Sequence, residues 1–72
     1  MDVDESVAIR VNGESRRVPA GLSVAEMLTG MGVDPGKVAV ERNREIVPRS
    51  LLTQVPVEDG DQYEIVHFVG GG

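Results

Sequence analysis

The stretch PAGLSVAEMLTGMGV, residues 19–33, decides the fold. Its apolar residues recur at helical spacing, whereas those of the preceding segment alternate as in a strand. Ser23 and Glu26 form the S-x-x-E pattern of a capping box, which satisfies free backbone amides at a helix start. The apolar residues that follow have the i, i+3, i+4, i+7 spacing of one buried face: Val24, Met27, Leu28 and Met31. Gly32 suits the position just past the helix end. We therefore predict one helix of roughly two to three turns.

The residues before this helix predict a β-hairpin. Residues 7–11 alternate between apolar and other side chains, as in a half-buried strand. Asn12 and Gly13 then give the strongest short hairpin signal, because both residues tolerate positive φ. A return strand over residues 15–18 ends at Pro19, which has no N–H to donate to a neighbouring strand.

The residues after the helix predict short strands and turns. Residues 37–43, KVAVERN, alternate again, with Val38 and Val40 on one face and a turn beginning at Asn43. Residues 45–48 form a short strand that ends in proline and is expected at a sheet edge. Residues 49–57 show no clear period. We expect them to form an irregular turn that places both Leu51 and Leu52 in the core.

The element order is hairpin, helix, two short strands, turn and a final strand over residues 63–69. In this order the helix covers one face of a mixed sheet, and the first and last strands pair in parallel at its centre. The sequence thus predicts an α+β fold of the ubiquitin-like β-grasp type. We expect a single domain over residues 1–72, with residues 1–6 a frayed leader and residues 69–72 a flexible tail.

Composition excludes several classes of protein. The chain has 72 residues, no cysteine and a net charge of −5, with twelve acidic residues against seven basic ones. A nucleic-acid-binding protein needs a basic face, so this balance argues against one. The apolar runs are too short to span a membrane, and the acidic start is unlike a signal peptide. We expect a cytoplasmic protein without nucleic-acid or membrane partners.

The final strand has two different faces. One carries Tyr63, Ile65 and His67, and the other carries Glu64, Val66 and Phe68. Glu64 is poorly suited to burial, so its face is predicted to lie outside. Val66 and Phe68 then form an exposed apolar patch, which we predict to be a docking surface. The alternative is that Phe68 folds back over the sheet edge.

The ionisable groups near this strand do not suggest catalysis. His67 shares a side with Ile65 and is expected to be a packed or rim histidine, because no second His or Cys could share a metal. Asp59, Asp61 and Glu64 cluster around a turn, and a solvated loop explains them better than a calcium site. No nucleophile and base pair is evident, so the sequence predicts neither an enzyme nor a metal site.

The three glycines that follow, Gly70 to Gly72, are not a phosphate loop, because no helix follows them. One interpretation is a floppy terminus or a cloning remnant. The other is a slender tail whose backbone can enter a narrow enzyme site and carries a reactive carboxylate at its tip.

The combination of a β-grasp order and a terminal Gly-Gly resembles the ubiquitin-like sulfur carriers. Within them the chain is similar to the ThiS family of thiamine-biosynthesis sulfur carriers. The segments that carry the likeness are VNGE, SVAEML, VAVERNREIVPRS and VEDGDQYEIVHFVGGG. The resemblance spans almost the whole chain except the acidic leader, residues 1–6.

The resemblance implies a carrier rather than an enzyme. An adenylyltransferase of the ubiquitin-activating (ThiF) type would adenylate the Gly72 carboxylate with ATP and Mg²⁺. Sulfur from a cysteine desulfurase persulfide would convert the adenylate to a thiocarboxylate, and a thiazole synthase (ThiG type) would accept that sulfur. Gly70 and Gly71, which have no side chains, would let the tail enter the narrow active sites of both enzymes. The carrier itself would bind no cofactor, since ATP and Mg²⁺ belong to the activating enzyme.

Three alternatives stay open at this point. The carrier could serve another pathway, such as molybdopterin or cysteine synthesis. The chain could be a protein modifier that forms isopeptides through Gly72. It could also be a non-reactive β-grasp interaction module with an incidental tail.

Overall fold

A computed structural model of the chain describes residues 5–68, so the expectations for residues 1–4 and for the tail, residues 69–72, lie outside it. The elements follow in the order β1 (Ser6–Val11), β2 (Glu14–Pro19), α1 (Val24–Gly30), the 3₁₀ turn η1 (Pro35–Lys37), β3 (Val38–Arg42), β4 (Glu45–Val47), the 3₁₀ turn η2 (Arg49–Leu51) and β5 (Gln62–His67). The prediction that residues 1–6 form a frayed leader is therefore wrong for Ser6. This residue begins β1 and accepts a 3.0 Å hydrogen bond from Arg17 Nε.

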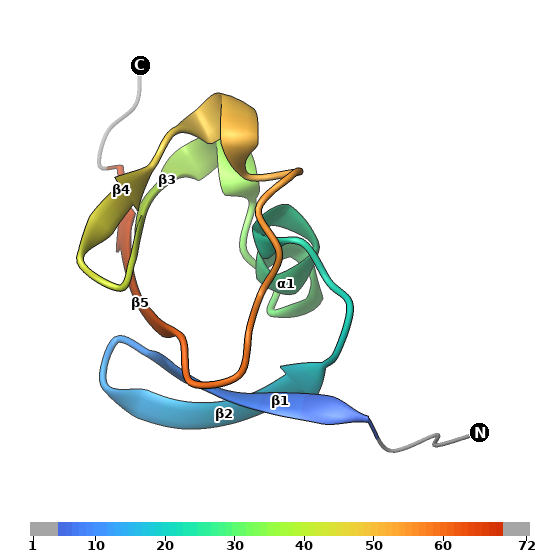
Figure 1. Ribbon diagram of the computed structural model, residues 1–72. Helices are drawn as coiled ribbons and strands as arrows, with labels where there is room; N and C mark the ends of the chain where they lie inside the picture. The colour runs from blue at the N-terminus through green and yellow to red at the C-terminus, as the bar shows by residue number, and fades with distance from the viewer. Residues whose placement is uncertain (1–4, 69–72) are drawn as a thin grey trace.

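The strands form one five-stranded mixed sheet in the order β2-β1-β5-β3-β4. β1 pairs with β5 in parallel, and the other neighbouring pairs are antiparallel. The sheet curves, and α1 lies on its concave side (Figure 1). This arrangement confirms the predicted ubiquitin-like β-grasp fold, with the last strand at the centre and β4 at an edge.

The helix forms where its sequence predicts. Ser23 Oγ accepts a 3.1 Å hydrogen bond from Glu26 N, and Glu26 Oε1 accepts a 2.9 Å bond from Ser23 N, which completes the capping box. The helix ends at Gly30 after seven residues. Gly32 has a φ of +80°, a value that suits glycine and allows the Val33 N–H to bond to a helix carbonyl. α1 therefore has about two turns, the lower end of the predicted range.

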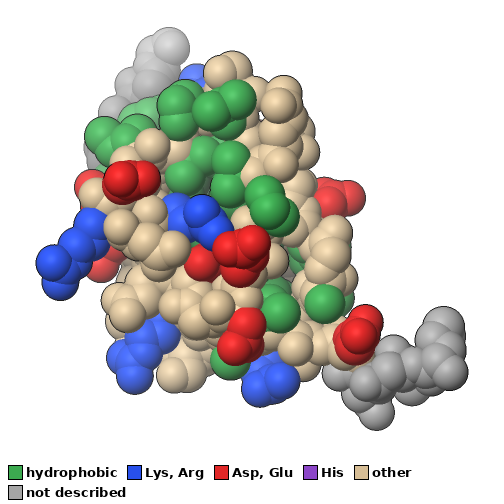
Figure 2. Space-filling view, in the orientation of Figure 1, with side chains coloured by type: hydrophobic (Ala, Val, Ile, Leu, Met, Phe, Trp, Pro, Cys, Tyr) green, Lys and Arg blue, Asp and Glu red, His purple; other side chains and the backbone are tan. Residues whose placement is uncertain are grey.

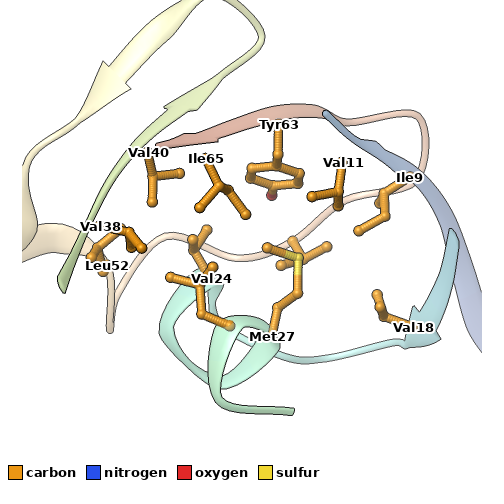
Figure 3. Close-up of a cluster of buried hydrophobic side chains, with 12 residues drawn as sticks. Ile9, Val11, Val18, Val24, Met27, Val38, Val40, Leu52, Tyr63 and Ile65 are labelled. Atoms are coloured by element: carbon orange, nitrogen blue, oxygen red, sulfur yellow. The ribbon is translucent and has the colours of Figure 1, made fainter. Parts of the chain in front are cut away.

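The core lies between α1 and the concave face of the sheet. Tyr63 and Ile65 point from β5 toward Val24 and Met27 of α1, and Tyr63, Val24 and Met27 are almost completely buried (Figure 3).

The segment after β4 gives the core one leucine instead of the predicted two. Leu52 is 3 % exposed, but Leu51 is 40 % exposed. The expectation was wrong for Leu51, because the Leu51 N–H bonds to the Pro48 carbonyl in a 3₁₀ turn. With three residues per turn, consecutive side chains point in different directions, so only one of the two leucines faces the core.

Candidate functional site

The alternation of β5 divides its side chains as predicted. Tyr63 and Ile65 are buried at 1 % and 7 % exposure, whereas Glu64 and Val66 face solvent. His67 is exposed although it shares a side with Ile65, because it is the last residue of the strand. The interpretation of His67 as packed is therefore wrong, and its place at the sheet rim is confirmed.

The outer sheet face carries what we call the apolar patch: Ala39, Ile46, Val66 and Phe68. Ala39 is paired with Val66 across β3 and β5. Val66 is 62 % exposed and Phe68 is 53 % exposed, so the sheet edge does not cover Phe68. Figure 2 shows hydrophobic side chains gathering toward β4 and η2, whereas charged side chains are more frequent toward β1 and β2.

Ile46 is the most exposed large apolar residue of the described chain, at 75 %. The sequence did not reveal it, because β4 is only three residues long and its alternation is too short to assign a face. The edge position predicted for β4 was the available signal, since an edge strand has one side open to solvent.

Phe68 is held at the end of β5 by two contacts. Its N–H donates a 3.0 Å hydrogen bond to the Lys37 carbonyl, just before β3. The guanidinium carbon of Arg49 lies 5.4 Å from the centroid of the Phe68 ring, within the range of a cation–π contact. Phe68 and Arg49 border a pocket of about 170 Å³ that is lined mainly by apolar residues of β3 and β4, together with Pro48 and Leu52 on either side of η2.

Next to the apolar patch, two carboxylates face each other. Glu41 of β3 and Glu64 of β5 are register partners on the outer face, and both are exposed. Like charges directly opposite one another are unfavourable. Within residues 5–68 neither forms an ion pair, because both ion pairs there involve Arg42. The outer face thus combines apolar surface with uncompensated negative charge.

The loop before β5 differs from its prediction. Asp61 was expected in a solvated loop, but it is only 4 % exposed. Its carboxylate accepts hydrogen bonds from Arg42 Nε at 2.8 Å, the Glu58 N–H at 2.9 Å, the Tyr63 hydroxyl at 2.7 Å and Asn43 Nδ2 at 3.1 Å. The available signal was Tyr63, because a tyrosine on the buried face needs a partner for its hydroxyl.

These contacts shift the pKa values of Asp61, Tyr63 and Arg42. Burial by itself raises the pKa of Asp61, but the hydrogen bonds from Arg42, the Glu58 N–H, Tyr63 and Asn43 outweigh it and lower the pKa below the usual 3.8. Burial, and then the bond to Asp61, raise the pKa of the Tyr63 phenol. The Asp61 hydrogen bond raises the pKa of Arg42. The group is therefore an ionised carboxylate with fixed donors and has a structural role.

Asp59, in contrast, is exposed and accepts a hydrogen bond from the backbone of β1. Its Oδ1 accepts a 2.8 Å hydrogen bond from the Ala8 N–H, and the Gly60 N–H donates a 2.7 Å bond to the Ala8 carbonyl. Among residues 5–68, no group of three or more His, Asp or Glu side chains is placed to hold a metal ion.

Asn12 extends the central strand pair. It has a φ of +51°, as the predicted hairpin requires. Its side chain also reaches β5, where Oδ1 accepts a 2.8 Å bond from the Ile65 N–H and Nδ2 donates a 3.2 Å bond to the Ile65 carbonyl. The amide thus lengthens the β1–β5 pairing and helps to fix the strand that leads to Phe68. Gly70, Gly71 and Gly72 lie outside the described residues.

Comparison with known proteins identifies the family. The family model described as "ThiS family" matches residues 9–72. The chain belongs to the ThiS family. A solved ThiS structure is similar throughout: the crystal structure of the thiamine biosynthesis protein (ThiS) from Geobacter metallireducens has a TM-score of 0.77 and 35 % sequence identity, and the match covers 92 % of this chain and 100 % of that one.

Two curated relatives agree with membership of the ThiS family. The sulfur carrier protein ThiS of Bacillus subtilis is 40 % identical over 50 residues, which cover 69 % of this chain and 76 % of that protein. The thiazole synthase of Paramagnetospirillum magneticum is 56 % identical over 62 residues, which cover 86 % of this chain and 19 % of that protein. The chain spans about a fifth of the length of the thiazole synthases that it matches.

No helix within residues 5–68 has the length and apolar character needed to cross a membrane.

Proposed function

We propose that this protein is a sulfur carrier for thiamine biosynthesis and acts as a co-substrate rather than as an enzyme. The observation that carries the proposal is the ThiS family match, which extends from β1 through Gly72. It is supported by a β-grasp fold whose central strand leads directly to the glycine tail.

The proposed chemistry takes place at the Gly72 carboxylate. A free carboxylate is a poor electrophile, so it first attacks the α-phosphate of ATP and displaces pyrophosphate. The terminal sulfur of a desulfurase-derived persulfide then displaces AMP. Cleavage of the sulfur–sulfur bond by a thiol reductant leaves the thiocarboxylate, in which sulfur replaces one carboxylate oxygen. Gly70 and Gly71 have no side chains to obstruct entry into the partner's site.

The thiazole synthase relatives favour thiamine over molybdopterin, cysteine or protein modification as the pathway served. The thiazole synthases of Paramagnetospirillum magneticum and Magnetococcus marinus each contain a segment similar to this chain within a much longer protein. A carrier-like segment in the same chain as thiazole synthase supports transfer of sulfur to that enzyme. We propose a thiazole synthase and a ThiF-type adenylyltransferase as partners, and the cytoplasm as the place of the reaction.

We propose that Val66 and Phe68 dock these partners, together with Ile46. All three are exposed apolar side chains of the apolar patch. An exposed apolar patch next to a reactive tail is suited to align that tail with an active site.

Intact-mass spectrometry tests the proposed function. The protein is incubated with a ThiF-type enzyme, a cysteine desulfurase, cysteine, a thiol reductant, ATP and Mg²⁺, and a species heavier by the difference between sulfur and oxygen is expected. Because oxidation of any of the three methionines adds nearly the same mass, alkylation of the product must label the terminal glycine.

Deletion of Gly72 is the control. It should abolish the heavier species and leave thermal unfolding nearly unchanged, because terminal residues contribute little to folding. Absence of the species with the full-length protein and active partner enzymes would contradict the proposed function.

A further inference from the structure

The contact between Arg49 and Phe68 lies at the last described position before the tail. We infer that Arg49 is a positioning residue, which holds Phe68 and thereby fixes the direction in which residues 69–72 leave the fold. The inference rests on the proposed function, because direction matters only if Gly72 must enter an active site.

Arg49 extends from a rigid base. It follows Pro48, whose ring restricts φ, and it begins η2. The Leu52 N–H bonds to the Arg49 carbonyl at 3.2 Å, and the Leu52 side chain is buried in the core at 3 % exposure. The backbone of Arg49 is therefore fixed on both sides, and its exposed guanidinium contacts the ring of Phe68.

Phe68, in contrast, lies one residue past the end of β5. Its backbone is tied to Lys37 by one hydrogen bond, while 53 % of its surface is exposed. The guanidinium over its ring, at 5.4 Å, joins β5 to η2 across the end of β3. Arg49 therefore restricts the side chain of Phe68 where the sheet no longer does.

The short length of the tail makes this restriction consequential. Residues 69–72 span at most about 14 Å when fully extended. An enzyme that takes the Gly72 carboxylate must therefore bring its active-site entrance close to Phe68. Small errors in the direction of a reacting group are costly, since a misplacement of about 1 Å can reduce a rate on the order of a hundredfold.

The first test compares Arg49→Gln, Arg49→Lys and Arg16→Gln in ATP-dependent adenylation by a ThiF-type enzyme. Loss of an exposed cation–π contact should lower kcat/KM by about two- to fivefold in Arg49→Gln. Arg49→Lys keeps a cation and should retain most of the rate. Arg16→Gln is the charge-matched control, because Arg16 is exposed on β2, at the opposite edge of the sheet, and should leave the rate unchanged.

A double-mutant cycle then separates positioning from direct contact with the enzyme. Phe68→Leu removes the aromatic ring but keeps an apolar side chain. If Arg49 acts through Phe68, Arg49→Gln causes no further loss in the Phe68→Leu background. An equal loss in both backgrounds would show that Arg49 contacts the partner directly and would overturn the inference. Reduced thermal stability with unchanged adenylation kinetics would also overturn it, because Arg49 would then have only a structural role.

NMR of the free protein distinguishes failure of this inference from failure of the proposed function. Arg49→Gln should shift the Phe68 ring and amide resonances, and Arg16→Gln should not. If the wild-type protein is not adenylated, the proposed function fails, and with it the reaction in which Arg49 would position the tail. If the wild type is adenylated and Arg49→Gln is equally fast, only the role of Arg49 is refuted.

Discussion

The Tyr63 hydroxyl donates a 2.7 Å hydrogen bond to Oδ2 of Asp61, and both residues are buried. Oδ2 also accepts bonds from Arg42 Nε and the Glu58 N–H. A buried carboxylate with several donors can lock the loop that leads into β5, because each donor would be costly to leave unpaired. This loop sets the start of β5, near whose other end lie Val66 and Phe68 of the apolar patch.

Replacing Asp61 with Asn should destabilise the protein by about 2–4 kcal/mol at neutral pH. The substitution removes the charge that compensates Arg42 and cannot accept all four bonds. Urea unfolding monitored by circular dichroism measures the loss. Tyr63→Phe removes only one donor and should cost about 1–2 kcal/mol. A smaller loss for Asp61→Asn than for Tyr63→Phe would contradict the central role of the carboxylate.

The stability of the wild-type protein should fall in acid partly through Asp61. Its pKa is lower in the folded state than the usual 3.8. A depressed pKa gives stability that is fully present above the unfolded-state value and is lost as pH falls through the folded-state value. Urea unfolding from pH 7 to pH 2 should therefore show a steeper loss below about pH 4 in the wild type than in Asp61→Asn. Parallel profiles would contradict the prediction.

Replacing Asn12 with Gly should keep the hairpin turn but remove the two hydrogen bonds to Ile65. We expect a loss of about 1–2 kcal/mol and faster hydrogen exchange at the Ile65 amide. Arg44→Gly is a matched control: Arg44 also has a positive φ, of +71°, and its side chain makes no hydrogen bond within the described part of the chain. An equal loss in both variants would show that added glycine flexibility, rather than the lost bonds, is responsible.

Replacing Phe68 with Glu should weaken partner binding more than folding. Phe68 is half-exposed, so the change in unfolding free energy should stay within about 0.5 kcal/mol. Affinity for a ThiF-type enzyme should fall at least about tenfold, as expected for a central apolar contact. Gln54→Glu adds the same charge at an exposed loop position and is the control for calorimetric titration. Loss of stability with intact binding would contradict a docking role for Phe68.

The sequence predicted features that depend on neighbours along the chain. The capping box of α1, the Asn-Gly hairpin and the two faces of β5 all follow from local spacing, and all are present. The strand order also followed, because few arrangements of a hairpin, a helix and later strands can bury one apolar face.

The features that the sequence did not predict depend on contacts between distant residues. The buried state of Asp61 requires Arg42 and Asn43, which are 19 and 18 residues away along the chain. The second role of Asn12 requires β5, 53 residues away. The sequence also did not predict the role of Arg49, because its contact with Phe68 forms only when η2 and the end of β5 lie together.

The central position of β5 has a consequence for when the protein can fold during its synthesis. Before β5 joins, the described chain consists of the β1–β2 hairpin, the helix and the β3–β4 hairpin, and β5 is the strand that connects the two hairpins. A nascent chain therefore cannot complete its sheet until β5 has been synthesised and has emerged from the ribosome. A chain truncated before β5 lacks the centre of its sheet and remains a substrate for proteolysis. Folding thus acts as a check on synthesis, because every copy that reaches the native state already contains β5.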